Sequence, residues 1–283
     1  MFPKELQFSL SRPINDVIDW IVVQYGESFE RFSDFLLTIL IFFEDLLRDT
    51  PWWLFLSVVF CLTFYISRKW TLCAFICGLF FLIGVLGLWD KAMQSLSLML
   101  VATGFSIIIG IPIGVLLSRS ERIRKVCLPL LDVMQTMPSF VYLIPALMLF
   151  GLGKVPAIFA TMIYALPPLI RLTDLGIRLV DKDVLEAAKA FGVSNREKLW
   201  GIELPLAFPN IMAGINQTTM MALSMVVIAS MIGARGLGEQ VLMGIQRLDV
   251  GKGTEAGIAI VAIAVILDRF TQSLGKKIKS SYS

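Results

Sequence analysis

The chain has 283 residues, of which 57% are hydrophobic and 17% are charged, and its formal net charge is +3. Soluble proteins contain about 45–50% apolar and about 25% charged residues, so a water-soluble globule is excluded and a lipid bilayer is expected around much of the chain. Because the sequence contains no histidine, a histidine general base, a Ser–His–Asp or Cys–His pair and an imidazole metal site are excluded as well.

Residues 1–50 form an acidic segment, with four basic and nine acidic residues. Within it, residues 35–43 are strongly apolar, but the run is only nine residues long before Glu44 and Asp45. Such a run is too short to cross a bilayer and predicts an amphipathic helix at the membrane surface. The composition changes near Pro51, and this change separates the acidic segment from the part of the chain that is expected to lie in the membrane.

Seven apolar stretches follow, each near the roughly 20 residues that a membrane-spanning helix needs. They comprise residues 51–67, 70–89, 92–118, 128–150, 155–175, 207–232 and 254–271. The last is the weakest, because it spans only if Asp268 and Arg269 reach the headgroups or pair inside a helix bundle. The sequence therefore predicts an all-α polytopic membrane protein with about seven transmembrane helices.

Lysine and arginine are concentrated on one predicted side of the membrane. Fifteen of them lie in or next to the loops after the first, third and fifth spans and in the C-terminal tail at 276–283. Cytoplasmic loops carry an excess of these residues, so these four regions are predicted to be cytoplasmic. Residues 1–50 are then predicted to lie outside, with the C-terminus inside.

The loop between the fifth and sixth spans, residues 181–205, is long, polar and periodic. An apolar stripe on a short first helix comprises Val184, Leu185, Ala187, Ala188 and Phe191. This helix is expected to end at Gly192, since a residue without a Cβ readily adopts the left-handed conformation. Ser194 and Glu197 have the spacing of a capping box and start a second helix, expected to stop near Pro205. Two short helices with an apolar face predict a docking element for a protein partner.

The same loop carries a motif with fixed spacing. Glu186-Ala187-Ala188 is followed after three residues by Gly192, and after nine more by Ile202-x-Leu204-Pro205. At every spacing the motif resembles the EAA signature of ABC importer permeases, in which this loop is a coupling helix seated in a groove of the ATP-binding subunit. The alternative is an ordinary amphipathic hairpin, which does not require these fixed spacings.

The resemblance implies the type I ABC importer permease architecture and a role for each matching residue. Those expected to couple the permease to the ATPase are Glu186, Ala187, Ala188, Gly192, Ile202, Leu204 and Pro205. The small side chain of Ala187 keeps the contact face of the helix low, Gly192 makes the turn, and Glu186 presents a charge at the interface.

Further stretches resemble the permeases for glycine betaine and related quaternary amines. They are residues 135–143, 167–173, 216–218, 223–229, 231–238 and 267–272. The resemblance covers roughly residues 90–275, and the two spans at 51–89 fit the layout of the same subfamily. It implies a homodimer in the bacterial cytoplasmic (inner) membrane that imports osmoprotectants captured by an extracytoplasmic binding protein. Arg235 departs from the pattern, since the family usually has glycine there.

The chain has no G-x-x-x-x-G-K-[ST] phosphate-binding loop. ATP and Mg are therefore expected on a separate homodimer of ATP-binding subunits, and this chain is expected to bind no cofactor or metal and to be no enzyme. The other expected partners are a second copy of the chain, the binding protein and the bilayer, with no nucleic acid. A permease for choline, carnitine or another small solute, and a stand-alone secondary transporter, remain as alternatives.

Two sets of residues inside the predicted spans each allow two interpretations. The first set, which lines a translocation path or hydrogen-bonds neighbouring helices, comprises Asn216, Gln217, Thr218 and Thr219. The second set, which provides hinges or close packing, comprises Gly110, Pro112, Gly114, Pro138 and Pro145.

Overall fold

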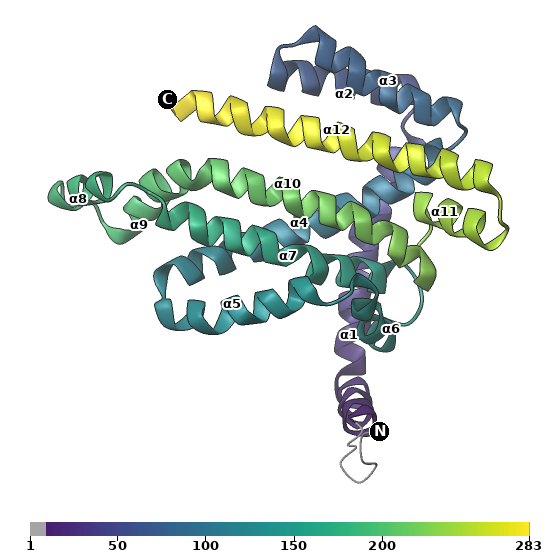
Figure 1. Ribbon diagram of the computed structural model, residues 1–283, viewed down its shortest axis with the longest axis horizontal. Helices are drawn as coiled ribbons and strands as arrows, with labels where there is room; N and C mark the ends of the chain where they lie inside the picture. The colour runs from purple at the N-terminus through teal and green to yellow at the C-terminus, as the bar shows by residue number, and fades with distance from the viewer. Residues whose placement is uncertain (1–9, 283) are drawn as a thin grey trace, which may run out of the picture.

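The computed structural model describes residues 10–282, with side chains described up to residue 277. The described residues form helices and no strand, as predicted. The framework consists of long helices lying side by side (Figure 1): α4 (Trp89–Arg119), α7 (Lys154–Arg178), α10 (Leu204–Ala229) and α12 (Val250–Tyr282). α7 packs along both α4 and α10, and α10 also contacts α12.

Contacts between helix ends give the direction of each helix. α7 begins beside the end of α10, where the Gly153 N–H donates to the Ile232 carbonyl at 3.0 Å. α4 ends beside the beginning of α10, where Arg119 pairs with Glu203. α4 and α7 therefore run in one direction and α10 runs in the opposite direction. Two small helices project from one end of this bundle, and α11 (Leu237–Gln246) lies at the other (Figure 1); we call these the docking end and the α11 end.

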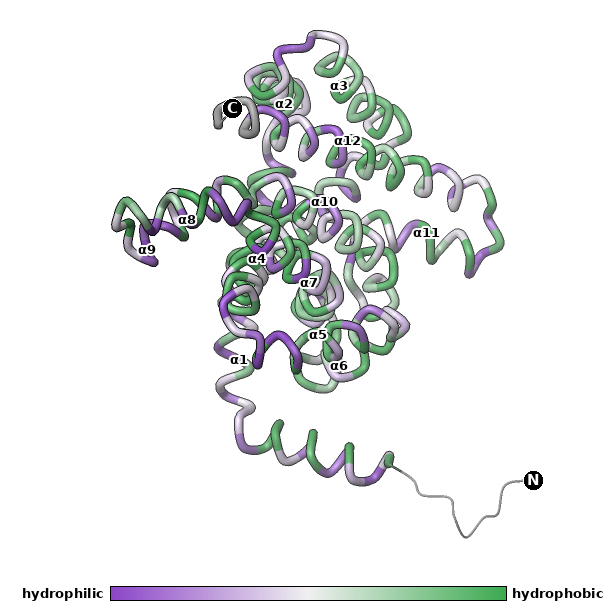
Figure 2. The backbone as a smooth tube through the Cα atoms, turned by 60° about the vertical axis from the view of Figure 1, so that its left-hand side comes forward, coloured by the Kyte–Doolittle hydropathy of each residue, from purple (hydrophilic) through white to green (hydrophobic). Residues whose placement is uncertain are grey.

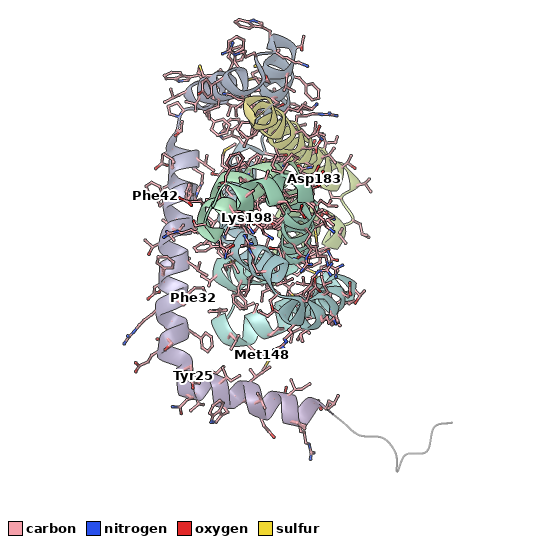
Figure 3. The ribbon with its side chains drawn as sticks, turned by 90° about the vertical axis from the view of Figure 1, so that its left-hand side faces the viewer. Tyr25, Phe32, Phe42, Met148, Asp183 and Lys198 are labelled. Carbon is pink, nitrogen blue, oxygen red and sulfur yellow. The ribbon has the colours of Figure 1, made fainter. Side chains whose placement is uncertain are left out.

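The N-terminal part of the chain begins with one long helix, α1 (Ser11–Asp49), which has 39 residues. It lies along one side of the bundle and bends near Tyr25 (Figure 3), and Leu36 and Leu40 are fully buried. The predicted amphipathic helix at 35–43 was therefore far too short. Apolar residues recur every three or four positions well before residue 35, which is the pattern of an amphipathic helix. Residues 1–9 of the predicted acidic segment lie outside the described residues.

α1 turns by 105° into α2 (Trp52–Ser67), which pairs with α3 (Trp70–Val85). α2 and α3 have 16 residues each. α2 matches the predicted span at 51–67, whereas α3 ends at Val85, short of the predicted end at 89, and is shorter than a candidate span. Both also contact α12. The last predicted span, 254–271, is the middle of the much longer α12, which also includes the predicted tail up to Tyr282, whereas Ser283 lies outside the described residues.

The predicted span at 128–150 is wrong as a continuous helix. It is divided into α5 (Glu121–Thr136), a 3-10 turn at Ser139–Tyr142, and α6 (Leu143–Phe150), with a bend of 108° between the two parts. Met137 adopts an extended conformation (φ −67°, ψ 135°) ahead of Pro138. Proline disfavours the helical conformation of the preceding residue, so the break occurs at this position.

In the described part of the chain, four helices are long and apolar enough to cross a membrane, or up to six if each bent pair counts as one span. The predicted number of about seven is therefore approximate. α4, α7 and α10 match the predicted spans at 92–118, 155–175 and 207–232.

Two glycines allow α4 to pack closely on α7. A Cβ at Gly110 would lie 2.9 Å from Leu169 Cδ2, and a Cβ at Gly114 would lie 2.5 Å from Thr173 Cβ and 2.8 Å from the Ile170 carbonyl oxygen. The helix continues without a break through Pro112, which lies between the two glycines. This geometry agrees with the packing interpretation of the pair, and a hinge role stays a prediction.

Gly114→Ala is expected to lower the free energy of unfolding by about 1–3 kcal/mol, because the added methyl group forces α4 and α7 apart. Gly104→Ala on the same helix is the matched control, since nothing lies within 4 Å of a Cβ there, and alanine is the better helix former. Thermal unfolding in detergent measures both variants. Equal midpoints for the two would contradict the close contact at Gly114.

Candidate functional site

The predicted docking element at 181–205 projects beyond the bundle (Figures 1 and 2). Its first helix is α8 (Lys182–Ala190), capped by the Asp181 carboxylate, which accepts from the Asp183 N–H at 2.9 Å. At its other end the Val193 N–H donates to the Ala188 carbonyl at 3.1 Å, and Gly192 has φ +73°. This bonding pattern satisfies the last carbonyls of a helix and requires a left-handed residue. The predicted end of the helix at Gly192 is confirmed.

The second helix, α9 (Asn195–Lys198), begins with the predicted capping box. The Glu197 N–H donates to Ser194 Oγ at 3.3 Å, and the Ser194 N–H donates to Glu197 Oε2 at 3.0 Å. Hydrogen bonds from the hydroxyl and then the backbone of Ser194 lower the pKa of the Glu197 carboxyl. The loop between the two helices is therefore closed at both sides by local hydrogen bonds.

The predicted stop near Pro205 is wrong. α9 continues through a π-helical turn (Leu199–Glu203) directly into α10, and Pro205 lies in the first turn of α10. Proline has no N–H to donate, and the π turn directly before it accommodates the irregular hydrogen bonding that results. The docking element is thus continuous with one of the central helices of the bundle.

The predicted apolar stripe of α8 divides into two faces. Leu185 is half-buried and Ala188 is buried, so these two hold the helix against the chain. Val184 and Phe191 are 41% and 87% exposed, and Ala187 is exposed between them. An apolar face that no other part of the described chain covers is typical of a partner-binding surface. Glu186 is also exposed on α8.

The second half of the motif lies at the root of the docking element. Ile202, Leu204 and Pro205 are half-buried, and Leu204 packs against a core cluster that includes Leu169 and Ile211. The structure therefore separates the motif into an exposed head, formed by Glu186 and Ala187, and a half-buried anchor, formed by Ile202, Leu204 and Pro205.

A buried carboxylate fixes this root to α4. Glu203, the unspecified position of the Ile202-x-Leu204 motif, is 3% exposed and accepts hydrogen bonds from Arg119, one of them at 3.4 Å. Lys198 Nζ lies 3.7 Å from Glu203 Oε1. Sequence reasoning missed this cluster, because Arg119 is 84 residues away and nothing in the local pattern predicts the pairing.

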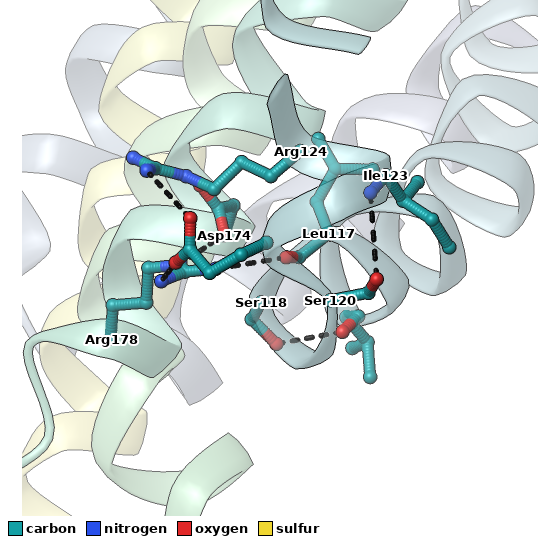
Figure 4. A network of polar contacts seen from close by, with 9 residues as sticks. Leu117, Ser118, Ser120, Ile123, Arg124, Asp174 and Arg178 are labelled. Carbon is teal, nitrogen blue, oxygen red and sulfur yellow. Dashed lines mark hydrogen bonds and ion pairs between the residues drawn. The ribbon is translucent and has the colours of Figure 1, made fainter. Parts of the chain in front are cut away.

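A second buried carboxylate joins α4, α5 and α7 at the docking end (Figure 4). Asp174 is 2% exposed and accepts from Arg124 Nε at 2.9 Å and from Arg178 Nε at 2.8 Å. Arg178 also donates to the Leu117 carbonyl at 3.1 Å. The spacing of Asp174 and Arg178 predicts their pair, whereas Arg171 on the same helix pairs with Asp132 of α5.

The four polar residues of α10 do not form one surface. Thr218 Oγ1 donates to the Ala165 carbonyl of α7 at 2.8 Å, and Asn216 Nδ2 donates to Asp268 Oδ1 of α12 at 3.0 Å. Thr219 Oγ1 donates to a carbonyl of its own helix. Only Gln217 of the four is exposed. Successive helix positions are rotated by about 100°, so four consecutive side chains cannot all face one path.

The remaining predicted residues lie elsewhere. Pro145 is inside α6, and Arg235 is exposed at the α11 end. There, Lys91 Nζ lies 2.7 Å from Glu239 Oε2 and joins α4 to α11. Among the described residues, no three cysteine, aspartate or glutamate side chains are grouped so as to hold a metal ion.

Related proteins share nearly the whole chain. It is 48% identical over 267 residues to the glycine betaine/proline betaine transport system permease protein ProW of Escherichia coli (strain K12), covering 94% of this chain and 75% of that protein. It is 43% identical to the glycine betaine transport system permease protein OpuAB of Bacillus subtilis (strain 168), over 95% and 96% of the two chains. The glycine betaine/carnitine transport permease protein GbuB of Listeria monocytogenes serotype 1/2a (strain 10403S) is 44% identical, over 95% and 97%.

The fold also occurs in a solved transporter. The inward-facing MetNI methionine ABC transporter superposes with a TM-score of 0.59 and 20% identity, covering 69% of this chain and 96% of that chain. Residues 106–280 match the family model described as binding-protein-dependent transport system inner membrane component. The chain thus belongs to this family, as a multi-pass permease subunit of an ABC importer with the type I permease fold.

Proposed function

We propose that this permease imports glycine betaine, proline betaine or a similar osmoprotectant, with ATP hydrolysed on a separate subunit. Two relatives that are more than 40% identical over 94–95% of the chain are named only for betaines. Their names support this substrate class. The third relative is also named for carnitine, so carnitine is the second candidate.

The docking element is the observation that carries the coupling role. Ala187 of the exposed head and the neighbouring Phe191 offer an apolar surface to an ATP-binding subunit, and the second helix of the element is continuous with α10. A displacement of α8 by the partner is therefore transmitted through the hydrogen-bonded turn at residues 191–194 to α9, which is continuous with α10. ATP and Mg are held by the partner, and the docking element of this chain moves with the partner.

We place the docking end in the cytoplasm. Exposed cations at this end include Arg122, Lys125 and Lys182, and such an excess marks the cytoplasmic side. The α11 end then faces outside, together with the N-terminal segment, and offers Arg235 to a binding protein. A second copy of the chain completes a translocation path along the exposed side of α10, where Gln217 lies between Ala213 and Ser224.

Gln217→Ala is expected to reduce uptake with no change in the thermal midpoint, because the side chain is exposed and has no partner to lose within the described residues. Thr218→Val is the matched comparison. It removes a buried hydrogen bond and is expected to lower the free energy of unfolding by about 1 kcal/mol, with uptake nearly unchanged. Uptake in vesicles and thermal unfolding measure the two effects, and a reversed pattern would rule out Gln217 as the path residue.

Competition in vesicles tests the substrate. Vesicles containing the complete transporter are given labelled glycine betaine with an excess of unlabelled proline betaine, carnitine, choline or methionine. Competition by the quaternary amines and none by methionine is expected. Inhibition by methionine alone would overturn the proposed substrate class.

A further inference from the structure

A basic cavity lies at the docking end, between the turn that joins α2 to α3 and the last part of α12. Its volume is about 790 Å³, and none of its 13 lining residues is acidic. Its cations are Arg68, Lys69, Arg269, Lys276 and Lys277. Five positive charges around one cavity create a strong local attraction for an anion.

One of these cations, Lys277, is held against the turn between α2 and α3. Lys277 Nζ donates to the Tyr65 carbonyl at 3.0 Å and lies 3.4 Å from the centroid of the Tyr65 ring. Asp268, the acidic residue next to Arg269, does not line the cavity, and its carboxylate accepts from Asn216 of α10 and from Gln272, which does line it. In the part of the chain that the structure describes, no ion pair joins the other four cations to a carboxylate.

An apolar groove continues from this cavity along the same two helices. It has a volume of about 480 Å³, lies between α3 and α12, and is lined by side chains that include Leu79, Leu82 and Val261. Phe75 lines both the cavity and the groove. The surface is therefore cationic at one end and apolar beyond it, along helices with the hydropathy of membrane spans.

We propose that the basic cavity and the apolar groove together bind one anionic phospholipid. The phosphate group lies among the cations, and an acyl chain lies in the groove between α3 and α12. Basic pockets between membrane helices bind such headgroups, whereas a free phosphate ion leaves the apolar groove unfilled. The lipid would bridge α12 and the hairpin formed by α2 and α3.

Native mass spectrometry of the purified full chain with phosphatidylglycerol or phosphatidylethanolamine tests the headgroup. Phosphatidylglycerol is expected to bind more tightly, and Arg269→Gln with Lys276→Gln is expected to weaken it by about 30-fold, from the loss of two cations. The matched control is Arg122→Gln with Lys125→Gln, which removes the same charges from exposed positions on α5 at the same end. Equal binding of the two lipids, or an equal loss in the control, would overturn the proposal.

A second variant tests the acyl chain. Gly257 lines the groove, and nothing lies within 4 Å of a Cβ at this position, so Gly257→Leu fills the groove without a clash. It is expected to weaken phosphatidylglycerol binding by about tenfold and to leave binding of inorganic phosphate unchanged. Unaltered lipid binding by Gly257→Leu, or inorganic phosphate that displaces the lipid at similar concentrations, would show that the site takes a free anion instead.

Discussion

Asp174→Ala is expected to lower the free energy of unfolding by about 3 kcal/mol, the largest loss of stability predicted for a single substitution in this chain. Asp174 is 2% exposed and separates Arg124 from Arg178. Without it, Arg124 and Arg178 keep, among the described residues, only the exposed carboxylate of Glu121 as an acidic partner where α4, α5 and α7 meet. Because the arginine side chains are 33% and 27% exposed, water relieves part of the repulsion, so the lower end of the range for broken buried pairs applies.

Denaturant titration in detergent measures this effect against a matched control. Asp132→Ala also removes a carboxylate from an arginine pair, but the Asp132 side chain is 63% exposed. Exposed pairs contribute about 0–1 kcal/mol, so a small change is expected. A loss for Asp174→Ala no greater than that for Asp132→Ala would show that the buried cluster does not hold the three helices together.

Gly192→Val is expected to reduce uptake by at least about tenfold while ATP hydrolysis by the complete transporter continues. Gly192 has φ +73°, a conformation that costs a β-branched residue about 1–3 kcal/mol. Valine therefore unwinds the turn between α8 and α9 and changes the position of the exposed head relative to α10. Folding is expected to survive, because a Cβ at this exposed position meets nothing within 4 Å.

Gly192→Asn is the matched control for the turn. Asparagine tolerates the left-handed conformation better than other non-glycine residues, so uptake is expected to stay near the wild-type rate. Uptake and ATP hydrolysis are measured on the same vesicles. If valine and asparagine gave the same ratio of uptake to hydrolysis, the left-handed turn would not be needed for coupling.

Local signals explain why the docking element was predictable. Gly192, Ser194 and Glu197 act within a few residues of one another, and the structure contains the turn and the capping box that they predict. The spans at α4, α7 and α10 were predictable for a similar reason, since their length and apolar composition are properties of a continuous segment.

Two of the errors arose at prolines, where two local signals competed. Pro138 and Pro205 both interrupt a helical pattern in the sequence. At Pro138 the helix ends, because Met137 adopts an extended conformation. Pro205 directly follows a π turn, and the helix continues through it. The position of a proline within its helix decides between these outcomes, and that position depends on where the helix begins.

The anchoring of the site could not be predicted, because it depends on long-range pairing. Glu203 meets Arg119 across 84 residues, and Thr218 bonds to Ala165 across 53. The same limit applies to the polar cluster of α10, where only the packing of α7 and α12 shows which side chain remains exposed. Composition predicted polar groups inside a span, and tertiary contacts determined the partner of each.

The proposed coupling is that this chain moves substrate only when an ATP-binding partner moves its docking element. Its most direct test is uptake of labelled glycine betaine into vesicles containing the purified permease and binding protein, with and without the candidate ATP-binding subunit. Uptake is expected to require both the subunit and ATP, and Gly192→Val is expected to reduce it by at least about tenfold. Uptake that persists without the subunit and follows an ion gradient would contradict it, and would identify the chain as a secondary transporter.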